Sequence, residues 1–515
     1  MSSTLTPSPT PRLGFSLLLA LLAVVAAGKV ILGDTLDPDC FWHLRVGDEI
    51  ARQAGAFPWP HPIVDDLSFA SIREPWTPYS WLAELAMKRL WDIGGFRAAV
   101  AAAAILESAF IILLGLGALE FTRSVHGHSR YLASALAAAM GGVLSLAYLS
   151  FRPVTAALVG LALVAWLLLR DRRKNQRSKA VWLVPPITAV LVNIHFFALF
   201  VPLWTAALLI GDALQPSPAA LPRLRRGSLL FLASAFACCL TPMLPGMIRS
   251  VLNYSQHDVM VRSETIAEFR PFYQGTMGHI SAALVLILVI CAVWQFIRTR
   301  RVPLGEVIWL IGSTALLFRL GRLSPLFAII AAPVFAAVLP KLSDRLLTRR
   351  PIVAMLAVAL ILSAWPVARA FPRSSQPLSS WLNRNGPNAP CYPCAAADFV
   401  DQHITAQTHH LICEFTWGGY LEWRLGPQYK TLMDGRTQLF TSDFWNTISL
   451  GSPAQKRSFL SATPADAAIL RTTHNPFGKL LSDLGWKTVY RDQFAEVMVP
   501  PSNKTATANT SDLSN

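Results

Sequence analysis

Long uncharged apolar stretches recur along the first three quarters of the chain and set the expectation for the whole molecule. Residues 154–169 and 280–293 are two examples. A soluble helix has one polar side that interrupts its apolar positions every turn, and these stretches have none. They therefore predict membrane-spanning helices.

The first apolar run, 13–33, allows two interpretations. It follows Arg12, and Ala26-Ala27-Gly28 resembles the cleavage site of a signal peptide. Alternatively it is an anchor helix whose Lys29 reaches outward to the membrane surface. We favour the anchor, and either interpretation leaves the following segment outside.

Charges in the loops predict the topology. Residues 34–95 carry ten acidic and five basic side chains, so this segment is predicted to be a large outer loop. Spans are expected at 96–119, 131–150 and 153–169. The last one ends in the cluster Arg170–Lys179, which marks the cytoplasmic side because basic residues concentrate there.

Two apolar blocks, 180–213 and 304–340, are flanked by basic loops at both ends. Equal charge at both ends requires an even number of crossings, so each block is predicted to be a hairpin. For 180–213 the alternatives are a hairpin of two short helices and a re-entrant pair. The outer turns would hold Asn193-Ile194-His195 in the first hairpin and Arg319 and Arg322 in the second. Further spans are expected at 228–247, 279–297 and 352–370.

These patterns predict an α-helical polytopic membrane protein with about eleven transmembrane helices in residues 1–371. The N-terminus is expected in the cytoplasm. Residues 372–500 alternate short apolar strands with helical stretches and predict a small extracytoplasmic α/β domain, with strands near 411–413, 431–433, 467–470 and 496–499. The Ser-, Thr- and Asn-rich tail, 501–515, is expected to be disordered.

Composition supports a membrane protein and excludes a nucleic-acid binder. Hydrophobic residues make up 53% of the chain and charged residues 15%, against about 25% charged in soluble proteins. The formal charge of +15 is set by Lys and Arg in short loops between spans, where they follow the positive-inside rule. The protein is expected in the cytoplasmic (inner) membrane. Cys391 and Cys394 form a CxxC without a second ligand pair, so we interpret it as structural or incidental rather than as a zinc site.

The predicted topology collects polar residues from distant loops on the outer side. Guanidiniums can hold a phosphate, a carboxylate can act as a general base, and Asp-x-Asp with a nearby His can hold a divalent cation. The candidate residues are Asp37, Asp39, His43, Arg152, Asn193, His195, Glu268, Arg270, Arg319 and Arg322.

Each residue also has a simpler interpretation. Outer arginines can pair with lipid headgroups, Asp37 and Asp39 can cap a following helix, and His195 can be an interior histidine with its hydrogen bonds satisfied. Glu107 lies inside a span, where it would line a cavity or pair with a neighbour.

The segment Asp37-Pro-Asp-Cys-Phe-Trp-His-Leu-Arg45 resembles the first outer loop of the GT-C superfamily of membrane glycosyltransferases. Bacterial members carry a D-x-D-x-x-W-H-L-like signature, followed by an amphipathic stretch that here includes Trp76 and Trp81-Leu-Ala-Glu84. Oligosaccharyltransferase catalytic subunits carry a related D-P-W-F-N-Y-R string. The resemblance makes Asp39 the matched catalytic acid.

Two further strings resemble oligosaccharyltransferase motifs. Thr265-Ile-Ala-Glu268 is similar to T-I-x-E, and Thr416-Trp-Gly-Gly-Tyr420, with Met433-Asp-Gly-Arg-Thr437 after it, is similar to the W-W-D-Y-G region. The acidic residue of that region is Gly418 here. Because the region binds the Asn-x-Ser/Thr acceptor in those enzymes, protein N-glycosylation is not implied.

The resemblance implies a polyprenyl-phosphate-linked sugar as donor and a glycan, lipid or protein as acceptor. Asp39 would activate the acceptor, with Asp37, His43, His195 and Glu268 positioning groups. A divalent cation would be held by Asp37, Asp39 and Glu268, and Arg152, Arg319 and Arg322 would hold the lipid phosphate. A lipid or sugar transporter or flippase, and a catalytically silent membrane scaffold, are the alternative functions.

Overall fold

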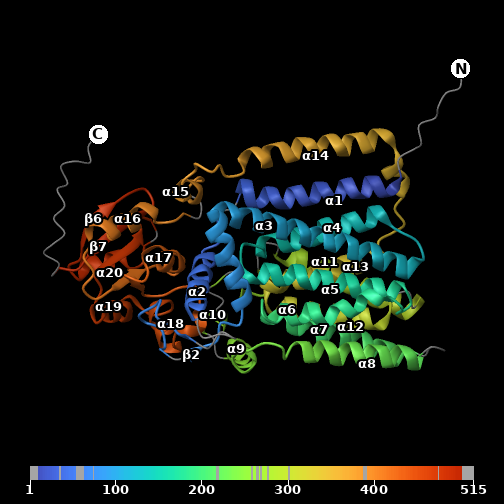
Figure 1. Cartoon of the computed structure of the whole chain (residues 1–515), viewed down its shortest axis with the longest axis horizontal. Helices are drawn as coiled ribbons and strands as arrows, with labels where there is room; N and C mark the ends of the chain where they lie inside the picture. The colour runs from blue at the N-terminus through green and yellow to red at the C-terminus, as the bar shows by residue number, and fades with distance from the viewer. Residues whose placement is uncertain are drawn as a thin grey trace, which may run out of the picture. The chain divides into compact units, whose positions relative to one another are not determined.

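The structure is a computed structural model, shown in Figure 1. It describes residues 10–33, 36–53, 63–73, 75–215, 220–256, 259–262, 266, 269–274, 278–299, 302–386, 391–473 and 475–501. Glu268, most of the string Thr265–Glu268, and the tail after Pro501 lie outside these residues. Contacts divide the chain into two units, and the second comprises Thr35–Phe96, Pro245–Ser263 and Pro372–Asn515.

The first unit is helical. Several of its helices begin with proline in the first turn, where the missing N–H removes no hydrogen bond. Its elements are α1 (Pro11–Gly28), η1 (Lys29–Gly33), α3 (Trp81–His126, whose first part belongs to the second unit), α4 (Tyr131–Ser145), η3 (Leu146–Tyr148), α5 (Pro153–Arg173), η4 (Lys179–Leu183), α6 (Val184–Leu191), η5 (Phe196–Leu199), α7 (Phe200–Leu214), α8 (Ala220–Ala237), η7 (Phe272–Gln274), α11 (Gly278–Thr299), α12 (Leu304–Arg319), η8 (Gly321–Leu323), α13 (Ser324–Val338), η9 (Asp344–Thr348) and α14 (Arg350–Ala370).

Eight helices in the described part of the chain are long and apolar enough to cross a membrane. The prediction of a polytopic membrane protein is therefore confirmed, whereas the number of about eleven spans stays a prediction. Both expected hairpins are present. The turn after α6 contains Asn193 and His195, and the turn after α12 contains Arg322.

One predicted boundary is wrong. The span expected at 228–247 is α8, which begins at Ala220 and ends at Ala237. The helix continues through Arg223, Arg225 and Arg226, and it stops before Pro242 and Pro245. Proline lacks the N–H that a helix interior needs, so the helix ends before the apolar pattern does.

Exposed apolar side chains lie on the outer helices of the first unit. In α14, Ile361 and Leu362 are 67% and 68% exposed, and Ile280 in α11 is 78% exposed. By contrast, α13 is almost entirely buried and packs against α4 and α12. A surface this apolar is expected where lipid covers the protein.

Two glycines allow α7 and α12 to pack closely. A Cβ at Gly211 would lie 2.2 Å from the backbone nitrogen of Gly305, so any side chain there would separate the helices. Small residues at helix contacts are typical of membrane proteins, because van der Waals packing rather than hydrophobic burial holds the helices together.

The structure answers the question of Glu107. Lys29 Nζ lies 3.2 Å from Glu107 Oε1 and 2.6 Å from the carbonyl oxygen of Leu149. The anchor interpretation expected Lys29 to reach outward to the membrane surface, and it does not. It pairs with the buried carboxylate, since an unpaired charge inside a span is costly.

The second unit contains a small mixed sheet, which confirms the predicted α/β domain. The strand order is β4-β3-β5-β7-β6: β3 pairs in parallel with β4 and β5, and β7 pairs antiparallel with β5 and β6. The strands are β3 (His410–Cys413), β4 (Lys430–Thr431), β5 (Ala467–Arg471), β6 (Lys487–Arg491) and β7 (Ala495–Val499).

Residues of the predicted first outer loop belong to this second unit. Ser68 forms a parallel bridge with Thr431 and so extends the sheet beyond β4, and α2 packs against α17. The remaining elements of the unit are α2 (Asp39–Gln53), β1 (Ile63–Val64), β2 (Pro75–Trp76), α9 (Leu244–Gln256), α10 (Val259–Arg262), α15 (Leu378–Leu382), α16 (Cys394–His403), α17 (Gly418–Leu425), η10 (Thr437–Leu439), α18 (Ser442–Ile448), α19 (Pro453–Ser461) and α20 (Gly478–Asp483).

Candidate functional site

The acidic turn Asp37–Asp39 starts α2. Asp37 Oδ1 accepts a hydrogen bond of 2.9 Å from the backbone N–H of Asp39, and Asp39 is the first helical residue. An Asp side chain that bonds the backbone two residues later stabilises a helix start. Asp37 thus has the capping role that the sequence left open, while the carboxylate of Asp39 extends from the first turn.

The carboxylate of Asp39 lies against the turn Asp434-Gly435-Arg436 of the same unit. A Cβ at Gly435 would lie 2.2 Å from Asp39 Oδ1 and 3.2 Å from Trp42 Nε1. Any side chain at Gly435 would therefore displace Asp39. The two strings that carry the resemblance, around Asp39 and around Gly435, are brought together by folding.

Behind Gly435 lies a buried ion network centred on Arg436. The guanidinium donates to Asp65 Oδ1 at 2.6 Å and to both oxygens of Asp434, at 3.0 and 2.5 Å, and it lies 3.5 Å from Glu422. Ser68 Oγ is within 2.9 Å of Glu422 and 2.7 Å of Asp434. The network therefore ties the segment 65–68 to the turn that contacts Asp39.

Three carboxyl groups share one guanidinium here, so one of them keeps its proton. Burial raises the pKa of Glu422 well above its ordinary value, and the charge of Asp434 raises it further. Burial also opposes ionisation of Asp434, but Arg436 outweighs it and holds the pKa of Asp434 below its ordinary value. Glu422 is therefore neutral, and Asp434 carries charge.

We expect Glu422→Gln to make the protein more stable at about pH 8 than wild type. Folding raises the pKa of Glu422, so its contribution to stability is complete below the ordinary value of 4.5 and declines as pH rises toward the folded pKa. Between these values the loss is about 1.4 kcal/mol per pH unit. Gln mimics the neutral carboxyl group and does not titrate.

Thermal unfolding of detergent-purified protein across pH measures this difference. The advantage of Glu422→Gln should vanish near pH 4.5. Asp483→Asn, at an exposed position of α20, is the matched control and should retain the pH dependence of wild type. A variant that is less stable than wild type at high pH would show that Glu422 is ionised in the folded protein.

His43 faces the interior of the second unit. It is 7% exposed, and its Nδ1 lies 3.0 Å from Glu84 Oε1 on α3. The ring of His43 lies next to that of Trp42, with centroids 3.5 Å apart. His43 therefore connects α2 to Glu84, which is 1% exposed, and a role in positioning α2 fits it better than direct contact with a substrate.

In the first unit, three of the candidate residues gather around the turn after α6. Burial lowers the pKa of His195 well below its ordinary value, and the nearby charges of Arg322 and Arg152 lower it further. Arg152 precedes α5, and Arg322 lies in η8 over the ring of Phe269. Folding thus places a neutral imidazole beside two guanidiniums that come from distant turns.

The remaining candidates of the first unit have other roles. Asn193 donates to the carbonyl oxygens of Ala189 and Leu240, at 2.8 and 2.9 Å, and so closes the turn. The side chains of Arg270 and Arg319 are exposed, although the carbonyl oxygen of Arg270 accepts from Gly321. These positions fit headgroup contact at least as well as phosphate binding.

The described residues do not complete the expected metal site. Among them, no group of three or more His, Cys, Asp or Glu side chains is arranged to hold a metal ion. Asp37 is engaged by the N–H of Asp39, and the expected third ligand, Glu268, lies outside the described residues. The divalent cation stays a prediction, and no chemical step is assigned to it.

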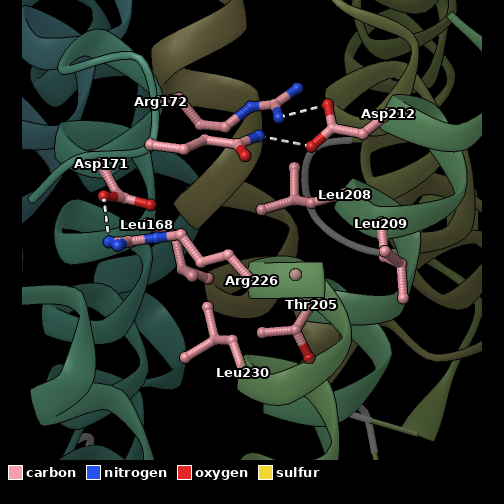
Figure 2. Close-up of a pocket in the computed structure, with 11 residues that line it drawn as sticks. Leu168, Asp171, Arg172, Thr205, Leu208, Leu209, Asp212, Arg226 and Leu230 are labelled. Carbon is pink, nitrogen blue, oxygen red and sulfur yellow. Dashed lines mark hydrogen bonds and ion pairs between the residues drawn. The ribbon is translucent and has the colours of Figure 1, made fainter. Parts of the chain in front are cut away.

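A cavity of about 30 Å³ between α5, α7 and α8 is structural. Figure 2 shows Arg172 directed at Asp212 and Arg226 at Asp171, with nitrogen–oxygen distances of 2.5 and 2.9 Å. The space is sufficient for about one water molecule. Asp171, Arg172 and Gln176 of the cluster Arg170–Lys179 line it, and none of the candidate residues does.

Several residues of the site escaped the sequence analysis. Asp65 and Glu422 had no motif around them, and Arg436 was noted only within a string. The sequence offered one signal for Asp65: the segment 34–95, which has short apolar runs, contains an unusual number of acidic residues. Cys391 and Cys394 are both buried and free, which leaves the CxxC without an assigned function.

Comparisons with known proteins bear on the fold. No protein-family model matches the sequence, and no curated protein matches it either. Among solved structures, the apo oligosaccharyltransferase of Archaeoglobus fulgidus matches with a TM-score of 0.50 and 12% identity, covering 89% of this chain and 69% of that one. A complex of the same enzyme with Zn and sulfate matches with a TM-score of 0.50 and 13% identity, covering 88% of this chain and 68% of that one.

ArnT from Cupriavidus metallidurans, bound to undecaprenyl phosphate, matches with a TM-score of 0.45 and 15% identity, covering 94% of this chain and 98% of that one. The match to the oligosaccharyltransferase extends over most of the chain, including both units. The chain therefore has the fold of the GT-C membrane glycosyltransferases, as the motif around Asp39 predicted.

Proposed function

We propose that this protein is a glycosyltransferase that moves a sugar from a polyprenyl-phosphate-linked donor to an acceptor on the outer face of the membrane. The observation that carries the proposal is the carboxylate of Asp39, which extends from the first turn of α2 against Gly435. It is a suitable general base in a fold shared with a known oligosaccharyltransferase.

The donor phosphate is assigned to the first unit. Arg152 and Arg322 supply two guanidiniums beside a neutral His195. Guanidiniums bind phosphate through paired, charge-assisted hydrogen bonds and stabilise it as it leaves. Nucleotide sugars are cytoplasmic, so an outward-facing site requires a lipid-linked donor. A divalent cation is not part of this proposal.

The test is donor consumption by purified protein in nanodiscs, using a panel of polyprenyl phosphates and diphosphates linked to hexoses or pentoses. Release of the polyprenyl carrier is measured by mass spectrometry, with empty nanodiscs as control. Consumption of at least one donor supports the enzyme. Binding of lipids without consumption across the panel would favour the transporter or the silent scaffold instead.

We expect Arg322→Gln to raise the KM for the consumed donor about tenfold or more, because a hydrogen bond to a charged group is worth about 1.5–3 kcal/mol. Arg319→Gln is the matched control. It removes the same charge three residues earlier, from an exposed side chain, and should change KM little. Equal effects of the two variants would show that only the overall positive charge matters.

A further inference from the structure

A cavity of about 480 Å³ lies at one end of the sheet in the second unit, where β3 and β5 begin and β7 ends. Asp466, Trp486 and Pro500 line it, and the strand register places Asp466 and Trp486 on either side of Pro500. The string Thr416–Tyr420 and the Arg436 network follow the carboxyl ends of β3 and β4, so the cavity lies at the opposite end of the sheet. Its size is within the range of about 300–1,000 Å³ that is typical of small-molecule sites.

The polar wall of this cavity is rich in hydrogen-bond acceptors. Asp466 is 2% exposed, and its carboxylate accepts the backbone N–H groups of Thr408 and His409 at 2.8 to 3.1 Å. A carboxylate offers about four lone-pair positions, so acceptor capacity remains. The hydroxyls of Ser461 and Thr463 each donate their proton to a backbone carbonyl at 2.8 Å, so toward the cavity they can only accept.

Donors and apolar surface complete the lining. Thr408 Oγ1 accepts from the N–H of His410 at 3.3 Å, which leaves its own proton to donate, and the exposed amide of Gln407 can donate as well. Trp486 and Leu484 supply apolar surface next to these groups. Since Trp486 is 9% exposed, its ring is held in place and part of it borders the cavity. A ligand must therefore donate several hydrogen bonds, accept others and cover a small apolar area.

These requirements select a neutral saccharide. A pyranose ring has hydroxyls around its rim that both donate and accept, and its C–H groups can cover part of an indole. An anionic ligand would be repelled by the carboxylate of Asp466. A quaternary ammonium ion needs a cage of aromatic rings, and Trp486 is the one aromatic residue among the described residues that line the cavity. An extended peptide presents successive N–H groups to opposite sides, so it meets fewer of the acceptors on one wall.

We infer that this cavity binds a neutral saccharide, at a site separate from Asp39. The C–H groups of one sugar ring cover Trp486, and its hydroxyls donate to Asp466 and to the oxygens of Ser461 and Thr463. No covalent bond forms or breaks at this site, which holds a glycan without reacting with it. The inference goes beyond the proposed transferase and does not depend on it, because binding here requires no lipid-linked donor.

Binding is measured on full-length protein in nanodiscs by ¹⁹F NMR after labelling with 5-fluorotryptophan. The resonance that disappears in Trp486→Phe reports on the cavity. The probes are maltotriose, cellotriose and mannotriose, each raised to about 20 mM, which reveals dissociation constants in the millimolar range. We expect at least one of them to shift this resonance saturably. If none does, the inference is overturned.

Ala462→Phe tests whether the saccharide lies in the cavity. Ala462 is exposed and lines the cavity, so a phenyl ring there would overlap the ligand without removing a hydrogen bond. The dissociation constant should rise about tenfold or more. Ala454→Phe, at an exposed position of α19 that does not line the cavity, is the matched control and should bind like wild type. Equal binding by both variants and wild type would place the saccharide elsewhere and overturn the inference.

Two further probes test the class of ligand. Choline chloride and acetyl-tetraalanine amide should leave the Trp486 resonance unshifted at the same concentrations. Saturable binding of either one in place of the trisaccharides would overturn the assignment to a saccharide. Because the resonance is read without turnover, the proposed transferase can fail while this site stands, and this site can fail while the transferase stands.

Discussion

Asp39→Asn is expected to reduce sugar transfer by about 100-fold to 10,000-fold, the usual contribution of a general base. The substitution keeps the size of the side chain and its fit against Gly435, where a Cβ would lie 2.2 Å from Asp39 Oδ1. It also keeps the backbone N–H that bonds Asp37. What is lost is the negative charge of the carboxylate and with it the ability to accept a proton. Release of the polyprenyl carrier from the consumed donor measures the effect.

Asp37→Asn is the matched control, two residues earlier in the same turn. Asn caps helices about as well as Asp, so α2 should form normally and transfer should change little. Asp37→Ala should instead cost about 0.5–2 kcal/mol of stability. If Asp39→Asn kept full activity and Asp37→Asn lost it, Asp37 would be the general base and Asp39 would not.

Arg436→Met is expected to destabilise the second unit by about 3–5 kcal/mol, because it leaves buried carboxylates without their counter-charge. Arg436 is 1% exposed, and Asp65 and Asp434 are 2% and 0% exposed. Protonation of a second carboxyl group would relieve part of this cost, so the loss should be smaller at low pH. Thermal unfolding, followed by tryptophan fluorescence, measures both effects.

Arg471→Met tests whether the destabilisation expected of Arg436→Met arises from the burial of its ion pairs. Arg471 pairs with Glu414 at 2.9 Å in the same unit, but its side chain is 33% exposed. An ion pair of this kind is worth about 1 kcal/mol or less, because water screens both charges. If the two variants unfold at the same temperature, the Arg436 network contributes no more than a surface pair.

Hydrophobic and charge patterns predict most of the first unit. Each hairpin follows from basic loops at both ends of an apolar block, and the turns at Asn193 and Arg322 are where that rule places them. The rule works because apolar length and loop charge are local properties that lipid and water act on directly. It fails at α8, where a helix begins within a basic segment and ends early before prolines.

The second unit is less predictable. β6 was missed because Lys487–Arg491 has only two neighbouring apolar residues, Val489 and Tyr490, flanked by polar ones, which is a weak strand signal at the edge of the sheet. The placement of residues 35–96 with the C-terminal domain also has no local signal. It arises from long-range contacts, such as the bridge between Ser68 and Thr431.

By itself, the sequence determined the membrane class, the helical hairpins and the small α/β domain, and it singled out Asp39. Only the tertiary structure decided what surrounds that residue. Gly435 and Arg436 lie almost four hundred positions away, so no spacing along the chain relates them to Asp39. Which buried carboxyl group keeps a proton depends on burial and neighbouring charge, and both exist only after folding.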